Sequence, residues 1–131
     1  MNSNSEQITP FILLHITAEF MNARRNHIVH GLELVRMLNI DYAQMPRLDE
    51  QIILPMGLSD SDRNDVVVTQ VSHNFDSLGR IYFTQLFCEK ILRVSSASNI
   101  VSVLDRFVAT ATEAGFMPEH RFWELNPPRF L

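Results

Sequence analysis

Apolar residues are dense at the start of the chain, after a polar segment at residues 1–7 that we expect to be disordered. Thr9-Pro10 is typical of a helix start, with a capping side chain followed by proline at the first helical position. Density of this kind predicts a helix that is buried or packs on two sides. Its apolar residues are Ile8, Phe11, Ile12, Leu14, Ile16, Ala18, Phe20 and Met21.

A second apolar series has helical spacing and begins after a polar joint at residues 22–26. It runs through Ile28, Leu32, Val35 and Leu38 and ends near Asn39. Residues three and four apart share one face of a helix, so this series predicts a second helix. One long bent helix over residues 9–39 is the alternative.

The middle of the chain predicts strands. Residues 51–54 form a short apolar run that Pro55 and Gly57 end, and residues 66–72 are rich in β-branched side chains. Turn residues at 74–79 connect the second run to residues 81–84, which predicts a β-hairpin. Residues 85–94 fit either a continued strand or a helix, and we prefer the strand.

The last pattern is a clear amphipathic helix. Its stripe consists of Ile100, Val103, Leu104, Phe107, Val108 and Ala111, and Gly115 is placed to end it. We therefore predict a single α+β domain over residues 1–131. A small antiparallel sheet, made of the hairpin and a short strand, would pack with two N-terminal helices and one C-terminal helix.

Composition restricts the class of protein. The chain has 131 residues, 46% hydrophobic content and a net charge of −4, with the charges spread evenly along it. Without a basic stripe we expect no duplex nucleic acid as a partner, and without a long apolar segment we expect no membrane span. Because Cys88 is the single cysteine, a reducing, cytoplasmic location is expected.

Chemically capable groups converge at residues 24–30, where Arg24 precedes Arg25, Asn26, His27 and His30. The order Arg-Asn, three residues, His resembles the catalytic signature of HEPN-type ribonucleases. That resemblance implies an all-helical fold in which Arg25 and His30 act together on a phosphate, usually across a dimer. On an ideal helix Arg25 and His30 would lie about 140° apart, and a hairpin follows them. The preferred interpretation is a polar contact surface.

Other candidate sites are weaker. Residues 60–65 begin like a calcium loop, but Asp65 stands where glycine is needed and Val71 where a bidentate glutamate is needed. The five histidines lack the spacing of a zinc site. His15, inside an apolar run, is expected to be a satisfied core or interface residue, and Cys88 a buried inert thiol. No cofactor is expected.

The C-terminal arm, residues 118–131, combines aromatic and basic side chains after the last helix. It contains Arg121, Phe122, Trp123 and Arg129, and Trp123 is the single tryptophan. Such residues are frequent at interfaces. The arm is expected to pack either on its own domain or on a second chain.

Taken together, these patterns predict a non-enzymatic interaction protein that binds a protein partner. We expect a homodimer, and an inhibitor of the immunity or phage counter-defence type is one such protein. The expected contacts are Arg24, Arg25, Asn26, His30, Arg121, Phe122, Trp123 and Arg129. Two alternatives remain: a binder of an anionic small ligand such as a nucleotide, and an HEPN-like ribonuclease that uses Arg25 and His30.

Overall fold

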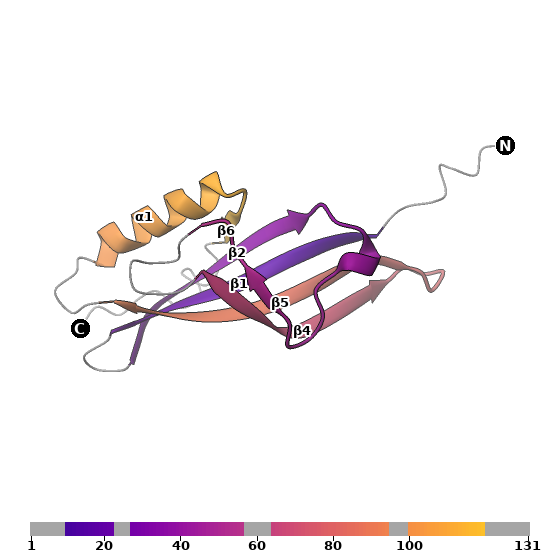
Figure 1. Ribbon diagram of the computed structural model, residues 1–131, viewed down its shortest axis with the longest axis horizontal. Coiled ribbons are helices and arrows are strands. Elements are labelled where there is room, and N and C mark those ends of the chain that lie inside the picture. Colours follow the sequence, from indigo (N-terminus) through magenta and orange to yellow (C-terminus); the bar gives the residue numbers. More distant parts are fainter. Residues whose placement is uncertain (1–9, 23–26, 57–63, 95–99, 120–131) are drawn as a thin grey trace.

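The computed structural model describes residues 10–22, 27–56, 64–94 and 100–119. Within these ranges the chain forms one large sheet, one α-helix and one 3-10 turn (Figure 1). The strands are β1 (Phe11–Asn22), β2 (His27–Leu38), β3 (Gln51–Ile53), β4 (Asp65–Phe75), β5 (Ile81–Val94) and β6 (Met117–Glu119). The helix is α1 (Ile100–Glu113), and the 3-10 turn is η2 (Tyr42–Gln44).

The prediction of two N-terminal helices is wrong, because residues 11–22 and 27–38 form strands β1 and β2. Every second side chain of β1 is buried in the core: Ile12, Leu14, Ile16, Ala18 and Phe20. That is the period of a strand, in which successive side chains point to opposite faces. The intervening residues of β1 are also largely apolar at first, which hides the alternation.

The prediction of a small antiparallel sheet is also wrong. The sheet is six-stranded and mixed, with the order β3-β4-β5-β1-β2-β6. Two long antiparallel hairpins, β1–β2 and β4–β5, are joined in the centre by a parallel pair between β1 and β5. In that pair Leu14 lies beside Leu86 and Ile16 beside Cys88, so the buried side chains of both strands face the same side.

Three predicted elements are confirmed. The short strand at 51–54 is β3, the preferred strand at 85–94 is the second half of β5, and the hairpin is β4–β5. Asp76 closes the turn of that hairpin, since its Oδ1 accepts hydrogen bonds from the backbone N–H groups of Leu78 and Arg80 at 2.9 and 3.0 Å. These bonds lower the pKa of Asp76. Gly79 supplies the positive φ of 79° that the turn requires.

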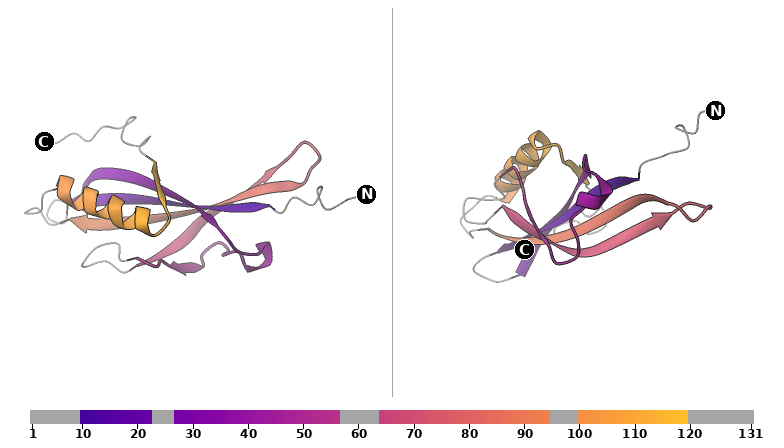
Figure 2. Two further views of the ribbon diagram at one scale, coloured as in Figure 1. Left: turned by 90° about the horizontal axis from the view of Figure 1, so that it is seen from above. Right: turned by 45° about the vertical axis from the view of Figure 1, so that its right-hand side comes forward.

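The two elements that the structure describes outside the sheet, α1 and η2, pack on the same face of it (Figure 2). In Figure 2, α1 and the segment around η2 lie on the same side of the sheet, over its two ends. The architecture therefore has two layers. The core lies between the sheet on one side and α1, η2 and residues 54–56 on the other.

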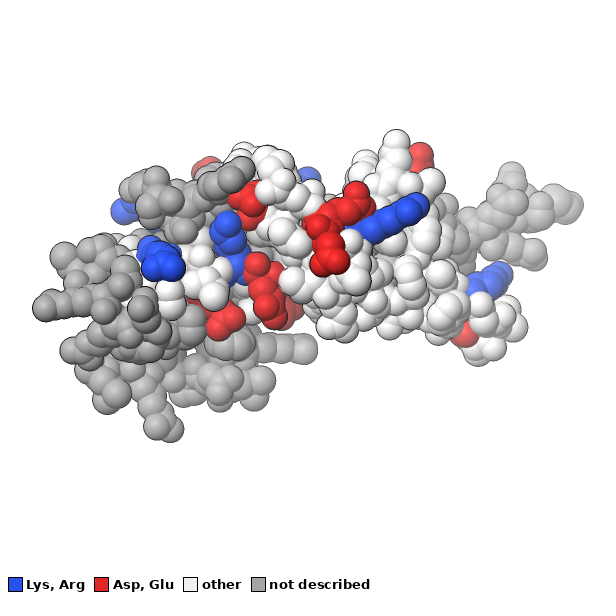
Figure 3. Space-filling view, turned by 60° about the horizontal axis from the view of Figure 1, so that its bottom comes forward, with Lys and Arg blue, Asp and Glu red and all other residues white. Residues whose placement is uncertain are grey.

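Charged side chains are scattered over the surface. Figure 3 shows acidic and basic residues interspersed on the face that it displays, with uncharged surface between them. Lys90 lies 3.9 Å from Asp65, and Arg80 lies 3.3 Å from Asp76. The exposed Arg80–Asp76 pair contributes little to stability, and the fold depends mainly on its apolar core.

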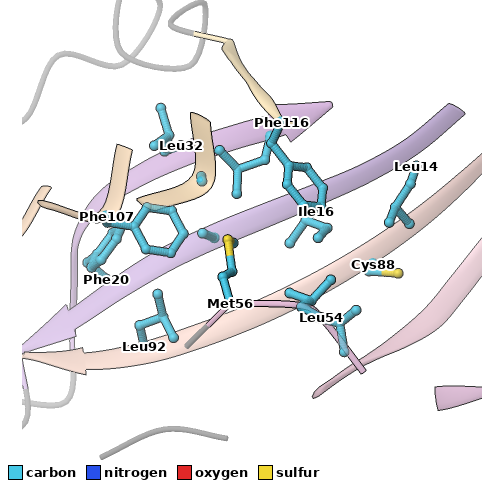
Figure 4. Close-up of a cluster of buried hydrophobic side chains, with 14 of the residues drawn as sticks. Leu14, Ile16, Phe20, Leu32, Leu54, Met56, Cys88, Leu92, Phe107 and Phe116 are labelled. Atoms are coloured by element: carbon cyan, nitrogen blue, oxygen red, sulfur yellow. The ribbon is translucent and has the colours of Figure 1, made fainter. Parts of the chain in front are cut away.

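The core contains side chains from every layer (Figure 4). Phe107 of α1 packs against Phe20 of β1, and Leu54 and Met56 enter from the segment that follows β3. Other members include Leu32, Leu34, Val66, Val68, Leu86, Cys88, Leu92, Leu104, Ala111 and Phe116. A core of this size is the main source of stability in a chain of this length.

The predicted C-terminal helix is confirmed as α1, and so is its end at Gly115. Gly115 has a φ of 92°, and the N–H of Phe116 donates to the carbonyl of Ala111 at 2.9 Å, which is the Schellman arrangement. Arg36 of β2 adds a second cap, because its guanidinium donates to the carbonyl of Ala114. In the part of the chain that the structure describes, no helix is long and apolar enough to span a bilayer.

Candidate functional site

The second face of the sheet carries no packing element among the described residues. It is made of the odd-numbered residues of β1, β2 and β5, whose even-numbered neighbours point into the core. We call this surface the open face. It consists of Leu13, His15, Thr17, Glu19, Glu33, Val35, Met37, Phe83, Gln85, Phe87, Glu89 and Ile91, with Met117 of β6 beside Val35.

A chain of hydrogen bonds crosses the centre of the open face. Nδ1 of His15 lies 3.0 Å from Oε1 of Glu33, and its Nε2 lies 3.0 Å from Nε2 of Gln85. Oε1 of Gln85 in turn accepts from Nδ2 of Asn74 at 3.4 Å. The links join β2, β1, β5 and β4 in that order. The amide nitrogen of Gln85 can only donate, so Nε2 of His15 accepts this bond and its Nδ1–H donates to Glu33.

Apolar side chains surround this polar chain. The imidazole of His15 stacks on the ring of Phe87 with the centroids 4.8 Å apart, and His15 is only 9% exposed. Leu13 and Val35 are half-buried, whereas Met37 and Met117 are 61% and 68% exposed. At the centre of the open face, His15 is thus buried and held in place by hydrogen bonds. The rim is apolar and contains flexible methionine side chains.

An acidic row crosses the open face next to this centre. Thr17 of β1 lies opposite Glu89 of β5 on one side and opposite Glu33 of β2 on the other. Glu33 in turn pairs with Glu119 of β6 in the backbone register. His15 contacts Glu33 from the adjacent row. The carboxylates of Glu33 and Glu89 favour cationic groups on this part of the open face.

The open face can bind more readily than it can catalyse. Both ring nitrogens of His15 are engaged, so neither is available as a base or a metal ligand in this arrangement. Cys88 is buried on the other face, and burial raises the pKa of its thiol to about 11. Within the described ranges, no three His, Cys, Asp or Glu side chains are grouped as a metal site would require.

A second polar cluster lies on the core side of the sheet. The hydroxyl of Tyr42, in η2, lies 2.6 Å from Nδ1 of His73 and 2.8 Å from Oγ1 of Thr84. Nδ1 of His73 is itself 2.9 Å from the same Thr84 oxygen. Thr84 is fully buried, and the three groups satisfy one another. The cluster holds η2 against strands β4 and β5.

Of the contact residues predicted from sequence, the structure describes His30. It lies on β2 with 5% exposure, on the core side near the ring of Phe20. Burial lowers its pKa to about 4. The structure thus places His30 in a strand and in the interior, not on a helix face.

The other predicted contacts lie outside the described residues. They are Arg24, Arg25 and Asn26 in the β1–β2 connection, and Arg121, Phe122, Trp123 and Arg129 in the C-terminal arm. The polar N-terminus at 1–7 and most of the calcium-like loop lie outside them as well.

Sequence reasoning did not single out the residues of the open face, apart from expecting His15 to be satisfied. The available signal was the alternation of His15, Thr17 and Glu19 with Ile16, Ala18 and Phe20. That alternation indicates a strand with a second, partly polar face. Gln85 and Glu33 could not be connected to it, because their partnership depends on which strands are neighbours.

Comparisons with protein-family models, curated proteins and solved structures gave no match to this chain.

Proposed function

We propose that this protein is a non-enzymatic interaction protein that binds a protein partner through the open face, in the cytoplasm. One observation carries the proposal: a long sheet buries one face under α1 and presents on the other face an apolar surface built around oriented polar groups. Surfaces of this kind mark binding sites in soluble proteins.

The character of the open face suggests the character of the partner. Leu13, Val35 and Phe87 offer half-buried apolar area, and Met37 and Met117 can repack around different shapes. The acidic row favours basic side chains. We therefore propose a partner that presents apolar residues together with arginine or lysine.

The acidic row also bears on two other binding partners expected from the sequence, an anionic ligand and a second copy of the chain. An anionic ligand such as a nucleotide would meet Glu33 and Glu89, so the open face does not favour it. Two copies meeting through identical open faces would bring two acidic rows together. The homodimer expected from the sequence stays a prediction, and we place its interface elsewhere on the molecule.

A matched pair of variants tests the proposal. Met37→Glu adds a charge at an exposed position of the open face, whereas Leu78→Glu adds the same charge at the exposed tip of the β4–β5 turn. Proteins captured from the native host by the wild type would be identified, and the purified partner titrated by calorimetry. We expect at least ~10-fold weaker binding, or ~1.4 kcal/mol, for Met37→Glu and unchanged binding for Leu78→Glu. Equal affinities of both variants and the wild type would contradict the proposal.

A further inference from the structure

We infer that the outer edge of β4, residues 70–74, pairs antiparallel with the same edge of a second copy and so forms a homodimer. This pairing goes beyond the proposed function, because it uses an edge of the sheet and not the open face. Four properties of the edge carry the inference: its lack of a backbone partner among the described residues, its sequence, its match to itself across a two-fold axis, and the apolar side chains beside it.

Strand β3 covers only the first part of β4. It pairs with residues 65–67, and Val68 then exchanges hydrogen bonds with the backbone of Asp49 and Glu50 at 2.8 and 3.0 Å. Among the described residues, no further backbone group pairs with this edge of the sheet. The rest of β4 therefore presents N–H and C=O groups to which another strand can bond.

Two residues of the free edge direct their backbone groups outward. The N–H and C=O of Val68 point away from β5, because they bond to the segment before β3. The bulge between Val68 and Gln70 shifts the pairing with β5 by one residue. Outward and inward groups alternate along an antiparallel strand, so the next outward residues are Val71 and His73.

The free edge has none of the side chains that commonly protect an edge strand. Residues 69–75 contain no Lys, Arg, Asp, Glu or Pro, and edge strands of monomeric proteins are often interrupted by such residues. The two bulges of β4 lie at the ends of this segment, one before Gln70 and one after Asn74. Residues 70–74 are thus a regular, uncharged strand that is suited to pairing.

The segment matches itself when Ser72 lies on a two-fold axis. Val71 of each copy then pairs with His73 of the other, and the two pairs form four backbone hydrogen bonds. Gln70 and Asn74 meet across the axis, and the amide of Gln70 can donate to the side-chain oxygen of Asn74. This register uses every outward backbone group of the regular segment in both copies.

Apolar side chains flank the paired segment. Phe75 pairs with Ile81 and Val67 pairs with Glu89, so both point to the side of the open face. Phe75 is 61% exposed and Val67 is 39% exposed. With Ser72 on the axis, Phe75 of each copy lies near Val67 of the other, on the diagonal of the strand pair. Burial of these two contacts adds hydrophobic stabilisation to the backbone pairing.

Charge favours this edge over the open face as the contact between copies. The edge segment is uncharged, whereas the open face carries Glu33 and Glu89. In the paired sheet the two β4 strands lie between the two β5 strands, so the carboxylates of the copies stay apart. A two-fold contact of an edge with itself also occupies both edges and closes the assembly as a dimer.

The dimer has a consequence for partner binding, which rests on the proposed function. Pairing joins the sheets into one, with six strands from each copy. Side chains of paired strands keep their faces, so both open faces lie on one side and both α1 helices on the other. A partner with two binding segments can then engage both open faces, and the second contact forms at a high effective concentration.

Ser72→Lys tests the interface. It places two like charges next to one another at the two-fold axis, so we expect the dissociation constant of the dimer to rise at least ~10-fold. Sedimentation velocity over a dilution series measures it, and the wild type should sediment with twice the mass of the chain. Ala109→Lys adds the same charge at an exposed position of α1, toward the opposite end of the sheet from the β4–β5 turn (Figure 2), and should keep the wild-type constant. Circular dichroism checks that both variants are folded.

Cross-linking tests the register without adding a charge. In Ser72→Cys the two introduced thiols lie within reach of a short bis-maleimide, whereas Cys88 is 1% exposed and does not react. We expect most of this variant to form a covalent dimer on a denaturing gel. Ala109→Cys, treated at the same protein concentration, should remain monomeric on that gel.

Three results would overturn the inference. They are a wild type that sediments as a monomer at all concentrations in the series, a dimer that folded Ser72→Lys leaves intact, and equal cross-linking of the two cysteine variants. The dimer and the proposed function also fail separately. A monomeric wild type whose partner binding is weakened by Met37→Glu keeps the proposed function and removes the dimer. A dimer that Ser72→Lys dissociates, with partner binding unaffected by Met37→Glu, removes the proposed function and keeps the dimer.

Discussion

The ring of Phe107 in α1 meets the ring of Phe20 in β1 edge to face, with the centroids 5.2 Å apart and the planes at 87°. Phe107 is 5% exposed and Phe20 is 1% exposed. The contact fixes the helix onto the central hairpin, at the point where the two layers of the molecule meet.

Removing this contact should be costly. Phe107→Ala deletes a buried ring and leaves a cavity, so we expect the free energy of unfolding to fall by about 3–5 kcal/mol. Urea denaturation followed by circular dichroism measures the change. Val101→Ala removes a side chain that is 56% exposed on the same helix, and we expect a change within about 0.5 kcal/mol. Similar losses for both variants would mean that α1 does not depend on the Phe20 contact.

Gly79 and Gly115 allow the cost of backbone strain to be measured separately from the cost of steric crowding. Gly79 and Gly115 both have positive φ, but an added Cβ meets nothing within 4 Å at Gly79 and lies 3.1 Å from Cζ of Arg36 at Gly115. We expect Gly79→Ala to cost about 1 kcal/mol and Gly115→Ala to cost more, as measured by thermal unfolding. In an Arg36→Ala background the extra cost at Gly115 should disappear. Persistence of that cost would show that Arg36 is not its source.

His30 makes the stability depend on pH. Burial lowers its pKa from an ordinary value of 6.5 to about 4. Between these values the unfolded chain binds a proton that the folded chain does not, so the free energy of unfolding falls as the pH falls. The loss in the free energy of unfolding reaches about 3 kcal/mol at pH values below the folded pKa of about 4. Above the unfolded pKa of 6.5 this loss is absent.

The comparison of wild type with His30→Leu isolates this contribution. We expect the variant to lose less stability than the wild type between about pH 7 and pH 4, as measured by denaturant titrations at each pH. Val101→Ala changes an exposed side chain and no titratable group, and it should keep the wild-type slope. A His30→Leu protein with an unchanged pH dependence would contradict the assignment.

Tyr42 fastens the segment that covers one end of the core. Tyr42→Phe removes the hydroxyl shared with His73 and Thr84, and we expect a loss of about 1–2 kcal/mol in the free energy of unfolding. The effect should also be local. The N–H of Val68, which donates to the carbonyl of Glu50 at 3.0 Å, should exchange faster with solvent, whereas amides in α1 should keep their wild-type rates relative to global unfolding. Uniform loosening of the whole chain would argue against a local role.

The second half of the fold was predictable from local patterns. Consecutive β-branched residues at Val66–Val68, the turn around Gly79 and the stripe of α1 all reflect local preferences that the structure keeps. The first half was not, because β1 and β2 are central strands. Leu13 and Val35 cover the open face while Leu14 and Leu34 fill the core, so the sequence reads as a nearly continuous apolar run. Such a run is compatible with a buried helix as well as with a strand.

The candidate site could not be predicted from local sequence patterns, for a related reason. His15, Glu33 and Gln85 become partners only because β1 lies between β2 and β5, and the parallel pairing of β1 with β5 joins residues 70 positions apart. No spacing rule along the chain connects them. The cluster at Arg25 and His30 drew attention because its residues are adjacent in sequence, and the structure places His30 in the interior.

The parallel pairing of β1 with β5 has a kinetic consequence. Each hairpin can close through a short turn, but the sheet is not continuous until two strands separated by the whole middle of the chain align over their full length. Closing such a long loop is slow compared with forming a helix or a hairpin. Until it closes, β1 and β5 each present an unpaired edge that another chain could extend. The step that completes this sheet is therefore also the one at which a newly made molecule is most exposed to aggregation.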